Sequence, residues 1–202
     1  MAESFINQTE GSGKKSHAWD RTIGANLIQD EFVLPGEFPY ATYSVVAAAV
    51  SGATAASHII QIMAGATLPV RVRRIELTYV GAAAAVATYS MQVFRLTTAG
   101  TGGTAITPRP YDSADAASGA TAMTLPTAKG TEGVQLGQKS LWVMTAAIPP
   151  NSKNDFVWEQ KPGEKAIIIP AGTANGIAIK NPTGVAAVTY DVWIELVETN
   201  FV

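Results

Sequence analysis

The two histidines of this 202-residue chain, His17 and His58, are the first side chains to test for catalysis or metal binding. No second histidine lies at metal-ligand spacing from either of them, and the chain has no cysteine that could supply a thiolate. A Ser-His-Asp triad would have to use His58 alone, because His17 lies far upstream in a polar segment. The sequence therefore predicts that His58 packs in the core or at its rim, and it predicts no metal, no cofactor and no enzymatic activity.

Carboxylates give a second possible chemistry. Asp112 and Asp115 lie in the sequence PYDSADAAS, but their spacing does not match a twelve-residue calcium loop. A surface turn capped by aspartate side chains is the better interpretation. Glycoside hydrolysis needs two carboxylates at a set separation, which sequence alone does not establish for the carboxylates near the expected strand ends, Glu159, Glu164, Asp191 and Glu195.

The densest basic group is Arg71, Arg73 and Arg74. On a strand Arg71 and Arg73 share a face, so they form a positive ridge that faces an acidic neighbour or packaged nucleic acid. The alternative is an edge strand that charge protects from aggregation. The glycines of 100–103 do not form a phosphate-binding loop, because no Lys-Ser pair or helix follows them.

Aromatic side chains raise the possibility of a sugar-binding face. Trp142, Trp158, Trp193 and Tyr190 lie in expected strands, and carbohydrate modules built on β-sandwiches use such platforms. Core packing is the commoner place for these side chains, and no polar cluster accompanies them.

The composition favours surfaces that are covered in an assembly. Charged residues make up 15% of the chain against roughly 25% in ordinary soluble domains, and the net charge is −2. Interface cores are depleted in charge, whereas phosphate binding needs clustered Lys and Arg, so nucleic acid is not expected as a direct partner. No apolar run is long enough to cross a bilayer and no secretory leader is visible, so we expect no membrane partner and synthesis in the cytoplasm of its cell. A stable β-protein rich in small residues is the plainer alternative.

Strand patterns begin after the Pro-Gly-rich segment near residue 36. The clearest strand is 187–198, in which Val188, Tyr190, Val192, Ile194 and Leu196 share one face. The pattern slips at Arg73-Arg74, which predicts either a β-bulge or a strand that passes from one sheet to the other. A long turn-rich loop is expected at 97–133. The further expected strands are 40–50, 58–64, 70–80, 88–96, 134–144, 155–160, 166–169 and 175–180. The fold class is therefore all-β, a jelly-roll-like antiparallel β-sandwich over residues 39–202.

Residues 1–38 are expected to form an extended N-terminal arm. The segment is polar, has no sustained period and cannot bury a core of its own, although residues 25–32 could form one or two helical turns. A disordered tail is the alternative interpretation, but Trp19 is costly to leave in water and favours an arm that docks on a neighbour. The apolar anchors expected to make that contact are Phe5, Trp19, Ile23, Leu27 and Phe32.

With these features in place, the chain resembles a tailed-bacteriophage capsid decoration (cement) protein. The resemblance rests on WEQKPGEKAIIIPAG at 158–172, on GTANGIAIKNPTG at 172–184, and on the Ala/Thr/Gly-rich strands, the long loop and the polar N-terminal segment. It covers about residues 39–202 and is a resemblance in general features, since neither run is a family-defining motif. It implies a homotrimer that binds the outside of an icosahedral shell, with the major capsid protein as partner and the virion as location. No catalytic residue is implied.

The leading hypothesis is therefore a virion structural protein that contacts its partner through the arm and through Tyr111 and Met123 of the 97–133 loop. Two alternatives stay open. The chain could be a jelly-roll subunit that builds the shell itself, or a β-sandwich module of a virion that binds carbohydrate or a host receptor.

Overall fold

The structure, a computed structural model, describes residues 2–7, 15–23, 26–31, 40–81, 87–143, 155–161 and 163–199. Side chains are described at 40–80, 88–141, 155–161 and 163–199. The chain divides into two compact units, residues 1–39 and residues 40–202. All regular elements in the described ranges are strands, which confirms the all-β class.

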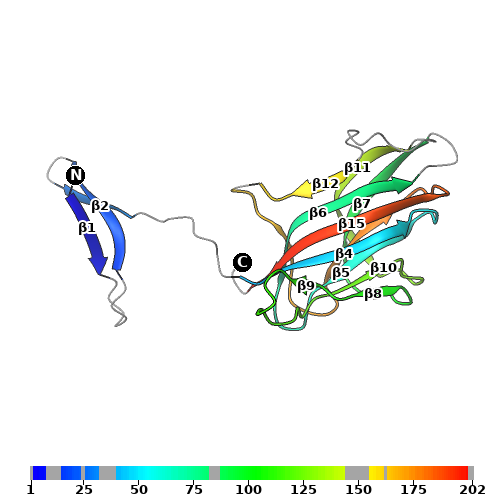
Figure 1. The fold of residues 1–202 in the computed structure, drawn as a ribbon, viewed down its shortest axis with the longest axis horizontal. Coiled ribbons are helices and arrows are strands. Elements are labelled where there is room, and N and C mark those ends of the chain that lie inside the picture. The colour runs from blue at the N-terminus through cyan, green and yellow to red at the C-terminus, as the bar shows by residue number, and fades with distance from the viewer. Residues whose placement is uncertain are drawn as a thin grey trace. The chain divides into compact units, whose positions relative to one another are not determined.

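The second unit is a β-sandwich of two antiparallel sheets (Figure 1). One, here called the β15 sheet, has the order β12-β6-β15-β4-β9, with β13 also paired to β6. The other, the β5 sheet, has the order β11-β7-β14-β5-β10-β8. In chain order the strands are β4 (Thr42–Ser51), β5 (Ser57–Met63), β6 (Val70–Gly81), β7 (Ala87–Leu96), β8 (Thr104–Ile106), β9 (Arg109–Pro110), β10 (Thr121–Thr124), β11 (Glu132–Val143), β12 (Phe156–Glu159), β13 (Ile167–Ile169), β14 (Gly176–Asn181) and β15 (Val188–Glu198).

The strands of the first half of the sandwich pair with those of the second half in reverse order. β4 pairs with β15, β5 with β14, β6 with β12 and β13, and β7 with β11, all antiparallel. Strands consecutive in the chain, such as β4 and β5 or β14 and β15, therefore lie in opposite sheets. Each such connection passes from one layer to the other, so the apolar faces of both sheets meet in one core.

The core forms where the alternation in sequence is strongest. Val188, Tyr190, Val192, Ile194 and Leu196 of β15 are all buried, which confirms the inward face predicted for this strand. Opposite them, the β5 sheet contributes the buried side chains Tyr89, Met91, Val93, Ile60, Ile62, Ile177 and Ile179. The rings of Tyr89 and Tyr190 pack at a centroid distance of 5.7 Å across the sandwich.

The β-bulge predicted at Arg73-Arg74 is confirmed. On β15 the consecutive residues Glu195 and Leu196 face Arg74 and Val72 of β6, so Arg73 is the additional residue. The alternative of a charge-protected edge strand is wrong, because β6 lies between β15 on one side and β12 and β13 on the other. The three arginines therefore belong to an interior strand of the sheet.

The sequence predicts one long loop at 97–133. The structure shows instead that this segment contains three short strands. β8 and β10 extend the β5 sheet beyond β5, and β9 pairs with β4 at the edge of the β15 sheet. These strands have two to four residues each, too short for alternation to identify them. Hydrogen bonds to partners far away in the chain stabilise them instead.

The N-terminal unit differs from the irregular arm that the sequence suggests. β1 (Ala2–Asn7), β2 (Lys15–Ile23) and β3 (Asn26–Glu31) form a three-stranded antiparallel sheet in the order β1-β2-β3. The helical turns considered for 25–32 are wrong, because Asn26–Glu31 is a strand. Ile23 of β2 pairs with Asn26 of β3, the first residue of the next strand.

Candidate functional site

A flap covers the part of the outer face of the β5 sheet that lies over β5. We define it as residues 97–103, which follow β7, together with residues 126–131, which lead into β11. The two segments are joined by a hydrogen bond from the Thr97 amide to the Thr131 carbonyl oxygen at 3.0 Å, and by two between Thr101 and Ala128. The hydroxyl group of Thr98 accepts from the Thr131 amide at 2.8 Å and donates to the Thr131 hydroxyl at 2.9 Å.

Gln61 attaches the flap to the middle of the sheet. Its amide nitrogen donates to the Gly100 carbonyl oxygen at 3.1 Å, and its amide oxygen accepts from the Gly100 amide at 2.9 Å. Met63, Leu96 and Ala178 form a small second apolar cluster on this side of the sheet. From His58 to Met63, every residue of β5 is buried, because the sandwich core covers one face and the flap covers the other.

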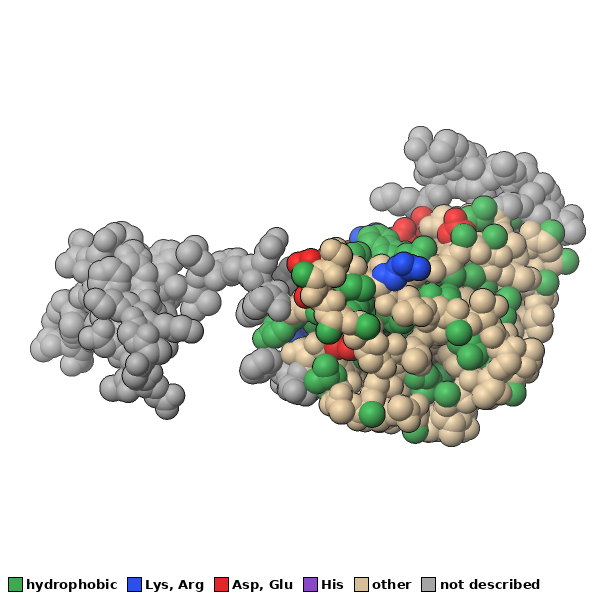
Figure 2. Space-filling view, turned by 60° about the horizontal axis from the view of Figure 1, so that its bottom comes forward, with side chains coloured by type: hydrophobic (Ala, Val, Ile, Leu, Met, Phe, Trp, Pro, Cys, Tyr) green, Lys and Arg blue, Asp and Glu red, His purple; other side chains and the backbone are tan. Residues whose placement is uncertain are grey.

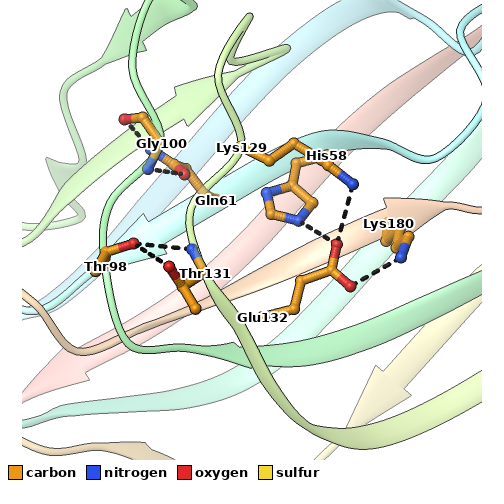
Figure 3. A network of polar contacts seen from close by, with 8 residues as sticks. All are labelled: His58, Gln61, Thr98, Gly100, Lys129, Thr131, Glu132 and Lys180. Carbon is orange, nitrogen blue, oxygen red and sulfur yellow. Dashed lines mark hydrogen bonds and ion pairs between the residues drawn. The ribbon is translucent and has the colours of Figure 1, made fainter.

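A charged network lies where the flap meets β11 (Figure 3). The Nε2 atom of His58 lies 3.1 Å from Oε1 of Glu132, and His58 is 0% exposed. The Lys180 ammonium group donates to Oε2 of Glu132 at 2.8 Å, and that of Lys129 donates to Oε1 at 3.4 Å. One carboxylate from β11 thus binds side chains from β5, β14 and the flap.

The geometry determines the proton positions in this network. A carboxylate only accepts hydrogen bonds, so Nε2 of His58 carries the proton that Glu132 accepts. Within the part of the chain that the structure describes, Nδ1 is buried without a hydrogen-bond partner. Burial lowers the pKa of His58 and outweighs the opposing effect of Glu132, so the imidazole is neutral.

The pKa of Glu132 is shifted in the direction that keeps it charged. Burial alone would raise this pKa, but hydrogen bonds from Lys180 and His58 and the charges of both lysines hold it below its usual value. The ionised carboxylate is therefore the centre of the network. Both oxygen atoms of this carboxylate accept hydrogen bonds, from His58 and Lys129 at Oε1 and from Lys180 at Oε2. The role of Glu132 is therefore to attach the flap to the sheet.

The close contact between flap and sheet requires glycine at position 100. A Cβ atom there would lie 2.7 Å from the Ala128 carbonyl oxygen and 2.8 Å from Oε1 of Gln61. We expect Gly100→Ala to destabilise the flap by about 2 kcal/mol, the range found for overpacked sites. Hydrogen exchange of the flap amides measures this, with Gly137→Ala as the control because nothing lies within 4 Å of a Cβ at that position. Equal protection in both variants would contradict the prediction.

A second candidate site is the outer face of the β15 sheet. One row across this face consists, in order, of Val157, Glu76, Trp193 and Val46. All of these side chains except Glu76 are apolar. Val46 is 61% exposed and Val157 is 43% exposed. The name "apolar row" is used below for Val157, Trp193 and Val46.

A row of alternating charge runs beside the apolar row. Arg74 faces Glu159 on one side and Glu195 on the other, and Ser44 separates Glu195 from Arg109. The guanidinium group of Arg74 lies 4.6 Å from the Trp193 ring centroid and donates to Glu76 from Nε at 3.1 Å. This charged row fixes the position of the indole ring.

The apolar row borders a shallow hollow of about 190 Å³. Its lining combines one aromatic ring, two carboxylates, a hydroxyl group and apolar side chains: Trp193, Glu76, Asp191, Thr78, Val46, Ala47, Ala48 and Val192. Oδ1 of Asp191 accepts from the Ala49 amide at 2.8 Å, at a β-bulge where Ala49 has a φ of 53°. The hollow is therefore a polar-rimmed depression beside exposed apolar side chains.

The structure separates the residues predicted to bind partners. Tyr111 is 55% exposed, and its hydroxyl group donates to Oε2 of Glu195 at 3.3 Å, at the rim of the β15 outer face. Met123 is partly buried, and Nε2 of Gln61 donates to its sulfur atom at 3.8 Å. Met123 thus lies in β10, a strand of the β5 sheet, and does not join Tyr111 in one surface. Phe5, Trp19, Ile23 and Leu27 lie in β1–β3, where no side chains are described, and Phe32 lies outside the described residues.

The sugar-binding platform considered from the sequence is not assembled in the described part of the chain. Tyr190 is fully buried, Trp158 packs against the core, and Trp193 lies on the opposite, outer face. The side chain of Trp142 is outside the described ones. Core packing therefore explains two of these aromatic residues, and Trp193 is the one that borders a hollow.

Asp112 and Asp115, considered from the sequence for a calcium site, lie in a surface turn. Oδ1 of Asp112 accepts from the Ala114 amide at 2.9 Å, and the Asp115 amide donates to the Asp112 carbonyl oxygen, which confirms the capped surface turn. Among the described side chains, no three His, Cys, Asp or Glu residues gather closely enough to bind a metal ion. Across the same residues, no helix is long and apolar enough to span a bilayer.

Comparison with protein-family models, with curated proteins and with solved structures finds no match to this chain.

Proposed function

We propose that this chain is a structural protein of a bacteriophage virion that binds and stabilises the icosahedral shell as a decoration protein. The observation that carries the proposal is the apolar row on the β15 outer face. Val46 exposes a large apolar side chain beside the half-buried Trp193, and Val157 exposes another in the same row beyond Glu76, next to a row of alternating charge. Protein interfaces have this composition, an apolar centre with a polar rim.

The rest of the surface supports docking on a large protein assembly. Figure 2 shows a face with scattered apolar side chains and few charged ones. With 15% charged residues overall, the chain has little electrostatic repulsion between neighbouring copies. Many copies can therefore pack closely on one shell, and we propose that they do so as homotrimers.

The reversed strand pairing supports the finer description of the sandwich as a jelly roll. In that architecture a long two-stranded ribbon folds over itself, which pairs the first strand with the last and the second with the one before last. The pairs β4–β15, β5–β14, β6–β12 and β7–β11 follow this scheme. Jelly rolls occur in viral capsid and lectin domains, an analogy of fold that is compatible with the proposal.

One observation favours a second candidate function, a carbohydrate-binding or receptor-binding module of a virion. The hollow beside Trp193 offers an aromatic ring together with the Asp191 and Glu76 carboxylates and the Thr78 hydroxyl group. These are groups that bind sugars by stacking and hydrogen bonding. The jelly-roll scheme is equally compatible with a subunit that builds the shell itself.

The test of the docking surface is sedimentation of the protein with capsids that lack it. We expect Val46→Glu to weaken binding at least tenfold, because a charge would be buried in the apolar centre of the interface. Val134→Glu is the matched control, since Val134 is 71% exposed on β11, in the other sheet.

Other outcomes of this test distinguish the candidates. Equal binding by both variants would overturn the assignment of the surface. Saturable glycan binding that is lost in Trp193→Ala, without capsid binding, would favour the carbohydrate module. Spontaneous assembly of the purified chain into particles of megadalton mass would favour a shell-forming subunit, whereas light scattering at trimer mass supports the decoration protein.

A further inference from the structure

The flap is attached to the sandwich through a histidine that is neutral where it lies. His58 comes from the centre of the β5 sheet and donates from Nε2 to Glu132, at the junction of flap and β11 (Figure 3). It is 0% exposed, and no group of the described residues pairs with its Nδ1 atom. We propose that His58 makes the flap acid-sensitive: the flap is closed over the β5 sheet when His58 is neutral and opens when it is protonated.

The first reason is the second ring nitrogen. Protonation would place a proton on Nδ1, which would become a buried donor without an acceptor. The ring would also carry a positive charge away from water. The imidazole has no solvent contact through which to relieve either effect. Movement of the flap away from β5 would admit water to this nitrogen.

The second reason is the set of charges around the ring. Glu132 favours the protonated form, whereas Lys129 and Lys180 oppose it. Glu132 already accepts hydrogen bonds from both lysines, so a third cation would add to a site whose negative charge is more than balanced. Burial and the two lysines together outweigh the single carboxylate.

The direction of the pH dependence follows from linkage. Burial lowers the pKa of His58 in the closed flap, whereas in the open flap the pKa returns to about 6.5. The closed state therefore keeps its full stability above pH 6.5 and loses it as the pH falls toward the closed-state pKa. Between these two values, the closing equilibrium changes by up to tenfold per pH unit. Glu132, whose pKa is below its usual value, adds a further loss only at lower pH.

What opening would uncover is apolar. The cluster of Met63, Leu96 and Ala178 is buried on the flap side of the sheet, and Gln61 would lose both of its bonds to Gly100. The device would thus convert a drop in pH into exposure of a small apolar surface on the β5 sheet.

Hydrogen exchange of the full chain between pH 8 and pH 5 tests the proposal, with exchange times adjusted for the intrinsic rate. We expect the amides of Gly100, Thr101, Ala128 and Thr131 to lose protection below pH 6.5, while amides of β15 keep theirs. His58→Gln retains a donor toward Glu132 but does not titrate, so its flap protection should not vary over this range. The same pH dependence in wild type and His58→Gln would overturn the proposal.

A second measurement keeps the proposal testable if His58→Gln does not fold. The chain has two histidines, so their ring signals can be followed individually by NMR. We expect the pKa of His58 to coincide with the midpoint of flap opening. Lys129→Gln, which removes one opposing cation, should raise the pKa of His58 in the closed flap and therefore move flap opening to lower pH. A lower flap protection in Lys129→Gln at every pH, with an unchanged midpoint, would show a purely structural role and contradict the switch.

Discussion

Replacing Glu132 by alanine is expected to lower the free energy of unfolding by about 3 kcal/mol. This is the low end of the cost of removing one partner from a buried ion pair, because Glu132 and Lys180 are only partly buried. The carboxylate receives the Lys180 ammonium at 2.8 Å and Nε2 of His58 at 3.1 Å. Without it, the histidine would have an unpaired donor, and the largely buried Lys180 would lose its counter-charge. Urea denaturation at pH 7.5, where His58 is neutral, measures the loss.

Two comparisons separate this effect from a general loss of surface charge. Glu164 is an exposed glutamate outside the network, and Glu164→Ala is expected to change stability by less than about 0.5 kcal/mol. Adding Lys180→Met to Glu132→Ala should recover part of the loss, because the uncompensated cation is removed. A loss below 1 kcal/mol for Glu132→Ala, or no recovery in the double variant, would contradict the central role of this carboxylate.

The long strands of the sandwich are predictable because each of them presents its own pattern. β15 alternates buried and outward residues over most of its length, and β6 repeats this with one interruption at Arg73. A single inserted residue reverses the alternation, which is why the sequence alone indicates the bulge. The pairing partners do not follow from the same pattern, since alternation identifies which side of a strand is buried but not which strand lies beside it.

The short strands and the flap cannot be predicted from the alternation of residues along the sequence. β8, β9 and β10 are specified by hydrogen bonds to β5 and β4, and the flap by contacts between residues 97–101 and 128–131. Their Gly, Thr and Ala content is also that of an irregular loop. The glycines of 100–103 are conspicuous in the sequence, but the sequence does not explain them. Glycine is required at position 100 because the Ala128 backbone approaches it, and this is a contact between distant segments.

The charged network shows the same limit at the level of a site. His58 and Glu132 are separated by 74 residues, so no motif connects them. The sequence does predict that His58 is a packed side chain, and its burial confirms this. What it does not reveal is that a lysine from β14 and one from the flap meet the same carboxylate. A buried histidine needs a polar partner, but its place in an apolar strand does not indicate which residue that is.

Deleting residues 1–39 is expected to leave the sandwich folded and to weaken capsid binding at least tenfold. The two units are compact separately, so the folded core of residues 40–202 does not depend on β1–β3. If the N-terminal unit and the β15 outer face both contact the shell, the second contact forms within one complex, and its effective concentration multiplies the affinity of the first. Losing one contact then reduces binding far more than its own weak affinity would indicate.

Co-sedimentation with capsids, together with a urea titration of the truncated chain, measures both parts of this prediction. Trp19→Ala in the full-length chain is the matched point variant, since Trp19 is the aromatic anchor expected in β2. Binding that is unchanged by the truncation would remove the N-terminal unit from the mechanism and leave the β15 outer face as the docking surface. Weakened binding in the truncation but not in Trp19→Ala would instead assign the contact to other residues of the unit, because avidity requires the second contact but not this particular anchor.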